Sequence, residues 1–178
     1  MAEETKEKWL NYLALTTVIF AVCATLSTFK GAGYSTKSVL SQTQAANQWA
    51  YYQAKSVKGY LYEIQRESLE LEIKKDNGKA SKSVAGEYEK KIALYTQKIK
   101  KYDGEKAEIF KEAKRLESQR DEAQKHSGIF GIAVIFLQIA ILLSSIAALM
   151  KNKLVWLAGA ASGTVGLVYF ANGFLLFF

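Results

Sequence analysis

The chain has 178 residues, one cysteine, one histidine, no proline and a formal net charge of +7 at pH 7. A single cysteine excludes an intrachain disulfide, and one cysteine with one histidine is too small a set for the usual transition-metal sites. The excess positive charge is mild and interspersed with acidic residues, which does not favour a nucleic-acid partner.

Three long apolar stretches contain no Asp, Glu, Lys or Arg: residues 9–29, 128–150 and 154–178. Each reaches the roughly 20 residues that an α-helix needs to cross the hydrocarbon of a bilayer. A cleaved signal peptide is the alternative for the first stretch, but this stretch is longer than an ordinary signal core, and glutamates are mixed with lysines before it. We therefore expect transmembrane helices at 9–29, 128–150 and 154–177, with residues 1–29 forming an N-terminal tail and the first span.

The polar middle of the chain, residues 30–127, carries almost all the charge. Absence of proline favours long helices, because nothing removes a backbone donor or forces a kink. The sequence KGAGY (residues 30–34) is predicted to be a flexible joint after the first span. A helix over about 36–75 then follows, with Ser35 or Thr36 as its N-cap.

A turn is predicted at the sequence DNGKAS, residues 76–81, because Asn77 and Gly78 tolerate the left-handed conformation that closes a helix. A second helix begins near Ser83 and covers about 83–127. No signal ends it before the second span, so it is predicted to continue without a break to Met150.

Apolar residues of this second helix alternate at three- and four-residue spacing, which is typical of a coiled coil. The predicted seam consists of Tyr88, Ile92, Tyr95, Ile99, Tyr102, Ile109 and Leu116. Its phase continues through Phe130 and Leu137 in the second span. The first polar helix offers a track of smaller residues: Val39, Ala46, Gln53, Tyr60 and Glu67, alternating with Thr43, Ala50, Val57, Ile64 and Leu71. These two helices are predicted to pack as an antiparallel hairpin.

Further aromatic residues, Trp49, Tyr51, Tyr52 and Tyr62, fall outside this track. They are interpreted as covering the surface of the hairpin, as amphipathic anchors near lipid headgroups, or as part of an interface between subunits, where Tyr and Trp are enriched. The subunit interface is the favoured interpretation.

Small residues of the third span, Gly159, Gly163 and Gly166, are predicted to allow close packing of helices in lipid. Packing within the chain is slightly favoured over packing between subunits. Gln138 and Asn172 are amides inside spans, suited to interhelical contacts or to lining a pore. Polar groups of the spans are expected to turn inward: Thr16, Thr17, Thr25, Gln138, Ser144, Ser145 and Asn172.

No Asp, Glu, Lys, Arg or His side chain lies deep in a predicted span, which argues against a proton-coupled transporter or a voltage sensor. Cys23 lies inside the first span, where it is no plausible nucleophile. His126 lies beside Lys125 at the membrane entrance and is interpreted as an interfacial histidine, since it has no His or Cys partner for a metal.

The sequence QWAYYQAKSVKGYLYE (residues 48–63), within the longer run from Lys8 to Glu63, resembles the N-terminal signature of a bacterial family of small membrane proteins. That family is catalogued only as a domain of unknown function, and the likeness extends in outline over the whole chain. The resemblance implies a bacterial membrane protein, but it implies no catalytic residue, substrate or partner.

Orientation is predicted from the basic residues of the short segments, Lys6, Lys8, Lys151 and Lys153. The positive-inside rule places the N-terminus and the 151–153 loop in the cytoplasm and the hairpin outside it. Lys114, Arg115, Arg120 and Lys125 argue the other way.

The sequence thus predicts an all-α protein of the bacterial inner (plasma) membrane, with three transmembrane helices and a long antiparallel coiled-coil hairpin between the first two spans. The predicted function is a non-enzymatic homo-oligomeric scaffold or adaptor that presents the hairpin to partners, with no cofactor. Its predicted partners are itself, membrane lipid and, through the hairpin, another protein. An oligomeric passive channel is the alternative.

Overall fold

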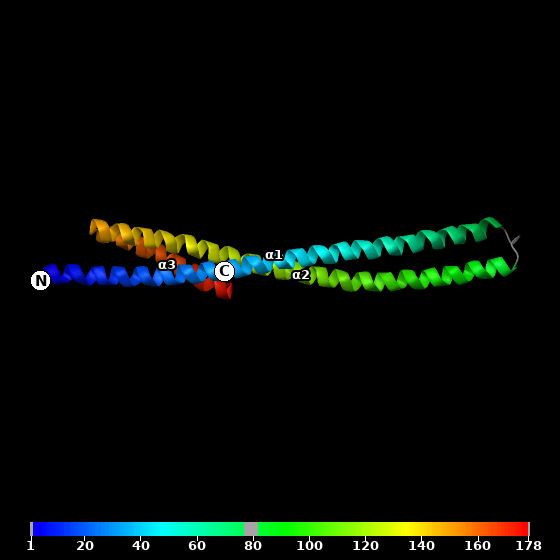
Figure 1. Ribbon diagram of the computed structural model, residues 1–178, viewed down its shortest axis with the longest axis horizontal. Coiled ribbons are helices and arrows are strands. Elements are labelled where there is room, and N and C mark those ends of the chain that lie inside the picture. The colour runs from blue at the N-terminus through cyan, green and yellow to red at the C-terminus, as the bar shows by residue number, and fades with distance from the viewer. Residues whose placement is uncertain (1, 77–81, 178) are drawn as a thin grey trace. The chain divides into compact units, whose positions relative to one another are not determined.

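The computed structural model describes residues 2–76 and 82–177, with the side chains of residues 8–75 and 84–177. In this part of the chain the fold is all-α (Figure 1): α1 covers Ala2–Asp76, α2 covers Lys82–Met150 and α3 covers Lys153–Leu175. α1 and α2 pack antiparallel as a hairpin, as contacts such as those of Trp49 with Glu117 and of Tyr62 with Tyr102 show. The predicted turn falls mainly on residues 77–81, which lie outside the described residues.

The helices form two compact units. One, here called the three-helix unit, comprises Met1–Leu40 and Gln119–Phe178, and the other, the two-helix unit, comprises Ser41–Ser118. α1 and α2 contribute to both units, whereas α3 belongs to the three-helix unit. The three apolar stretches 9–29, 128–150 and 154–178 all fall in the three-helix unit.

Each of α1, α2 and α3 contains a stretch long and apolar enough to cross a membrane. In α2 the helix continues through His126 and Phe130, where the charged sequence gives way to the apolar one. The prediction of a continuous second helix is therefore confirmed.

The flexible joint predicted at residues 30–34 is wrong, because α1 continues through this sequence. Ser35 and Thr36 are accordingly inside the helix and cap no helix N-terminus. The Thr36 hydroxyl donates a hydrogen bond to the Ala32 carbonyl of the preceding turn, at 3.0 Å.

Gly31 explains this outcome, since it provides close packing rather than flexibility. A Cβ placed on Gly31 would lie 3.1 Å from the Cβ of Phe130 in α2, and the Gly31 carbonyl accepts a hydrogen bond from the Ser127 hydroxyl at 3.1 Å. Glycine costs a helix up to about 1 kcal/mol relative to alanine, and these contacts with α2 offset that cost.

The core of the three-helix unit lies on one face of α2, whose buried residues recur every three or four positions. They are Ala123, His126, Phe130, Ala133, Leu137, Ala140, Ser144 and Ala147. From α1, Phe20 and Ala24 pack against Leu137 and Ala140. This spacing places a single stripe of α2 against the other two helices and leaves the opposite stripe on the outside.

The connection between α2 and α3 is short and locally determined. Lys151 adopts the left-handed conformation with φ of 50°, which closes α2. The side chain of Asn152 then accepts a hydrogen bond from the Leu154 backbone N–H at 2.9 Å and forms the N-cap of α3. The chain therefore reverses direction within two residues.

Candidate functional site

The α2 seam of the two-helix unit faces α1 to differing degrees along its length. Ile99, Ile109 and Leu116 are buried. The other four predicted residues, Tyr88, Ile92, Tyr95 and Tyr102, are half-buried. The rings of Tyr95 and Tyr102 lie 5.5 and 5.8 Å from the ring of Tyr62 in α1, so aromatic contacts extend the packing beyond the buried aliphatic residues.

The seam predicted for the first polar helix is wrong. Its larger members are 54–64% exposed: Val39, Val57, Tyr60, Ile64 and Leu71. The face of α1 that packs against α2 also follows three- and four-residue spacing, but it is rotated around the helix. It consists of Ser41, Ala45, Gln48, Tyr52, Lys55, Gly59, Tyr62, Arg66 and Leu69, all buried or half-buried.

Side-chain volume explains which face of α1 is used. A Cβ placed on Gly59 would lie 3.9 Å from the Cβ of Tyr102, so a small residue here lets the two backbones approach closely. Ser41 and Ala45 are likewise small and buried. Helices pack densely when small residues lie opposite large ones, and this leaves the larger aliphatic residues of α1 on the outside.

Three of the aromatic residues predicted to lie outside the seam in fact contact other side chains of the same chain. They are Trp49, Tyr52 and Tyr62. The rings of Trp49 and Tyr52 lie 5.6 and 6.3 Å from that of Phe110, a residue that the heptad count omitted. The indole N–H of Trp49 donates to Glu117 Oε1 at 2.8 Å. Tyr51 is the exposed member of the set.

Ion pairs flank the seam. Lys55 bridges the helices to Glu105, and this hydrogen bond lowers the pKa of the Glu105 carboxyl and raises that of Lys55. Within α2, Arg115 donates to Glu112 at 2.6 Å and lowers the pKa of that carboxyl. Charges of this kind are typical of a solvated helix face.

The predicted glycine face of α3 meets side chains of the same chain. A Cβ on Gly159 would lie 3.1 Å from the Leu143 Cβ, and one on Gly166 would lie 2.8 Å from Leu137 Cγ. A Cβ on Gly163 would overlap the ring of Phe20. All three glycines are buried, so their smallness is used inside the three-helix unit.

His126 has a role that the sequence did not indicate. It is only 8% exposed, and its ring stacks on that of Tyr34 with centroids 4.4 Å apart. Its Nδ1 lies 2.7 Å from the carbonyl oxygen of Gly173. Because the last four carbonyls of a helix lack intrahelical donors, an Nδ1–H tautomer supplies the donor that the end of α3 needs.

The two predicted amides lie in opposite environments. Asn172 is completely buried, and its Oδ1 accepts a hydrogen bond from the Phe177 backbone N–H at 2.7 Å. Gln138 is exposed on the outer face of α2, and its side chain makes no hydrogen bond within the residues that the structure describes. The expectation that it turns inward is wrong.

The inward orientation predicted for the hydroxyl groups of the candidate spans is wrong at two positions. Thr25 and Ser145 face outward, where their hydroxyls donate to the carbonyls of Ala21 and Ile141, both at 2.9 Å. A hydroxyl can bond to its own helix in this way and then tolerates a lipid-facing position. Ser144 is buried as expected.

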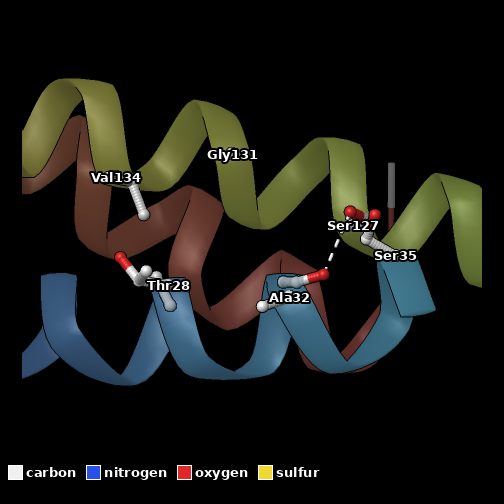
Figure 2. Close-up of a pocket in the computed structure, with 8 residues that line it drawn as sticks. Thr28, Ala32, Ser35, Ser127, Gly131 and Val134 are labelled. Carbon is white, nitrogen blue, oxygen red and sulfur yellow. Dashed lines mark hydrogen bonds between the residues drawn. The ribbon is translucent and has the colours of Figure 1, made fainter. Parts of the chain in front are cut away.

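A shallow groove of about 330 Å³ lies between α1 and α2 in the three-helix unit. Figure 2 shows Thr28 and Ala32 of α1 along one side and Val134, Gly131 and Ser127 of α2 along the other. Its lining consists of Ser27, Thr28, Gly31, Ala32, Ser35, Ser127, Gly131 and Val134. These small, uncharged side chains are suited to contact with apolar groups, and they include no acid, base or metal ligand.

A family model described as a domain of unknown function, DUF4337, matches residues 9–176. This match spans both units and all the helices described above. No curated protein and no solved structure matches the chain.

Proposed function

This chain belongs to the DUF4337 family, a domain of unknown function, and we propose that it is a homo-oligomeric scaffold or adaptor of the bacterial inner membrane. In this proposal the protein is not an enzyme. The three-helix unit lies in the bilayer, and the two-helix unit presents a surface to a partner protein.

One observation carries the proposal: the outer face of α1 in the two-helix unit exposes a regular apolar track. Val57, Leu61, Ile64 and Leu71 follow the spacing of a heptad and are all more than half exposed. Contiguous exposed apolar residues on a polar, water-facing element mark an interaction site. We refer to these four residues as the α1 track.

The expected occupant of the α1 track is an amphipathic helix of another protein. Knobs-into-holes packing requires the partner helix to carry the same heptad spacing. Lys58 flanks one end of the track and Glu67 and Glu72 flank the other, all three exposed. A parallel second copy would bring Glu67 close to Glu72 of its partner, and like charges at these positions repel.

A photo-cross-linking amino acid at position 64 in the full-length chain tests this function in bacterial cells. We expect an adduct with one different protein, and loss of this adduct when Val57→Gln and Leu61→Gln shorten the apolar track. Position 100, on an exposed part of α2, is the matched control and should give no such adduct.

Adducts that contain only copies of this chain, or no adduct while circular dichroism shows intact helices, would contradict partner presentation. Such results would leave the membrane assignment untouched, since that assignment rests on the apolar sequence of the three-helix unit.

The orientation in this proposal follows the short basic segments. Lys151 and Lys153 are expected on the cytoplasmic side with the N-terminus, and the two-helix unit on the other side. The channel alternative gains no support from Asn172, because its side chain is buried and accepts a hydrogen bond from the Phe177 backbone just after α3.

A further inference from the structure

The outer face of α2 in the three-helix unit carries a second stripe of residues at heptad spacing. It consists of Gly131, Ile135, Gln138, Leu142, Ser145 and Leu149, all exposed. The stripe lies opposite the buried face of α2 and continues to the end of the helix at Met150. It is called the α2 stripe below.

Gln138 lies near the middle of this stripe and near the middle of the uncharged sequence 128–150. Its amide has no hydrogen-bond partner in the described part of the chain. Hydrocarbon offers no hydrogen bond either, so an unpartnered amide at this depth is unfavourable. Unlike the hydroxyls of Thr25 and Ser145, it is not bonded to a backbone carbonyl of its own helix.

Gly131 gives a second, independent indication of a partner. Gly131 also lines the groove between α1 and α2 described above, and apart from the neighbouring backbone of its own helix no described atom lies within 4 Å of a Cβ placed on it. Packing within the chain therefore does not require a glycine here, in contrast to Gly163 and Gly166, which contact Phe20 and Leu137. A small residue on an outer face in lipid allows a second helix to approach closely.

We propose that the α2 stripe is the contact between two copies of this chain, which associate in parallel with Gln138 against Gln138. This inference rests on the proposed function, since it takes the chain to be a membrane-spanning homo-oligomer. It assigns the oligomer contact to the membrane and leaves the α1 track to another protein.

A second copy is the occupant that these observations favour. Copies with one topology in one bilayer have parallel α2 helices and place Gln138 at the same depth. A carboxamide both donates and accepts hydrogen bonds, so two Gln138 side chains satisfy each other across a two-fold axis. Ile135, Leu142 and Leu149 then form layers with their counterparts that alternate with the layers of Gly131, Gln138 and Ser145, as in a parallel coiled coil.

Energy transfer between labelled full-length chains in phosphatidylcholine liposomes tests the contact. Donor and acceptor dyes are attached at Lys100→Cys in a Cys23→Ala background, and the protein density for half-maximal transfer is measured. Gln138→Leu is expected to raise this density about 3- to 20-fold, the effect of losing an interhelical hydrogen bond in a membrane. Gln138→Asn, which keeps the carboxamide, should remain close to the parent.

Thr25→Val is the matched control, because it removes an outward polar group whose hydrogen bond lies within its own helix. The protein density for half-maximal transfer should be unchanged in this variant. As a second measurement that leaves Gln138 in place, oxidation of Leu142→Cys should yield a disulfide-linked dimer, whereas Val18→Cys, which is equally exposed on α1, should not.

Absence of transfer in the parent at every density would overturn both the homo-oligomer and this contact. Transfer that persists in Gln138→Leu, or dimers linked through Val18→Cys instead of Leu142→Cys, would overturn the contact alone. Ion flux through the parent liposomes that is lost in Gln138→Leu would also overturn it, because the amide would then line a pore.

Discussion

At the scale of single residues, glycines of this chain differ in what they contribute. Gly163 lies where α3 meets the ring of Phe20, and a side chain of any size would overlap that ring. Gly104, inside α2 in the two-helix unit, differs because, apart from the neighbouring backbone of its own helix, no described atom lies within 4 Å of a Cβ placed on it. The two glycines have the same helix propensity. Comparing their substitutions by alanine therefore distinguishes the effect of packing from the effect of helix propensity.

Gly163→Ala is expected to lower the free energy of unfolding by about 1–3 kcal/mol, as overpacked cores do. Gly104→Ala should instead raise it by up to about 1 kcal/mol, because alanine favours the helix and meets no neighbour. Equilibrium unfolding of both variants in one detergent, followed by circular dichroism, measures the difference. Equal effects of the two substitutions would contradict the contact with Phe20.

At the scale of elements, α1 shows why a heptad pattern does not identify the buried face. Val57, Ile64 and Leu71 form a regular apolar track, yet the face that packs on α2 contains Ser41 and Gly59. Burial of aliphatic surface favours the first face, whereas close approach to the aromatic residues of α2 favours the second. The geometry of the pair makes the second face the interface, and the first remains available to a partner.

The ion pair between Lys55 and Glu105 gives this helix pair a dependence on pH. A lowered pKa of Glu105 stabilises the folded state above the ordinary glutamate pKa of about 4.3, and this stabilisation is lost as the pH falls through the lowered value. The raised pKa of Lys55 gives a stabilisation with the opposite dependence on pH. Its stabilisation is present below about 10.4 and is lost as the pH rises through the raised value.

Acid should therefore lower the Tm of Glu105→Gln less than it lowers the Tm of the parent chain. The difference should be small, because the ion pair lies near solvent. Measuring the Tm of both proteins at a series of pH values, from neutral to below the pKa of Glu105, checks this. Glu108→Gln, whose carboxylate pairs with Lys111 at 3.3 Å on an exposed face, is the control. An acid profile of Glu105→Gln that coincides with the parent's would count against the bridge.

At the scale of the whole molecule, the proposed functions are divided between two kinds of surface. The α1 track is expected to face water and bind another protein, and the α2 stripe is expected to face lipid and bind a second copy. This division depends on the three-helix unit being inserted in the membrane, with one span separating the two-helix unit from the 151–153 loop. Topology is therefore the property of the whole molecule on which both proposals depend.

Labelling of single cysteines in spheroplasts with a membrane-impermeant maleimide measures this topology. In a Cys23→Ala background, Lys100→Cys should react in intact spheroplasts, and Lys151→Cys should react only after permeabilisation. Both positions are exposed in the structure. The reverse pattern would invert the proposed orientation, and reaction of both positions in intact spheroplasts would contradict a span between them.

The sequence by itself determined the helices, because the relevant signals are local. Uncharged stretches of about 20 residues, the absence of proline and an unbroken heptad phase through Phe130 and Leu137 are properties of neighbouring residues. They were enough to predict an all-α chain, stretches able to span a membrane and a continuous α2.

Only the tertiary structure decided how the faces of those helices are used. It made Gly31 a packing contact instead of a joint, placed Tyr62 inside the hairpin and oriented His126 toward the end of α3. It also left Gln138 on the outside. Each of these outcomes depends on which side chain lies opposite, at a separation of many residues along the chain, and helical periodicity carries no information about the partner's shape.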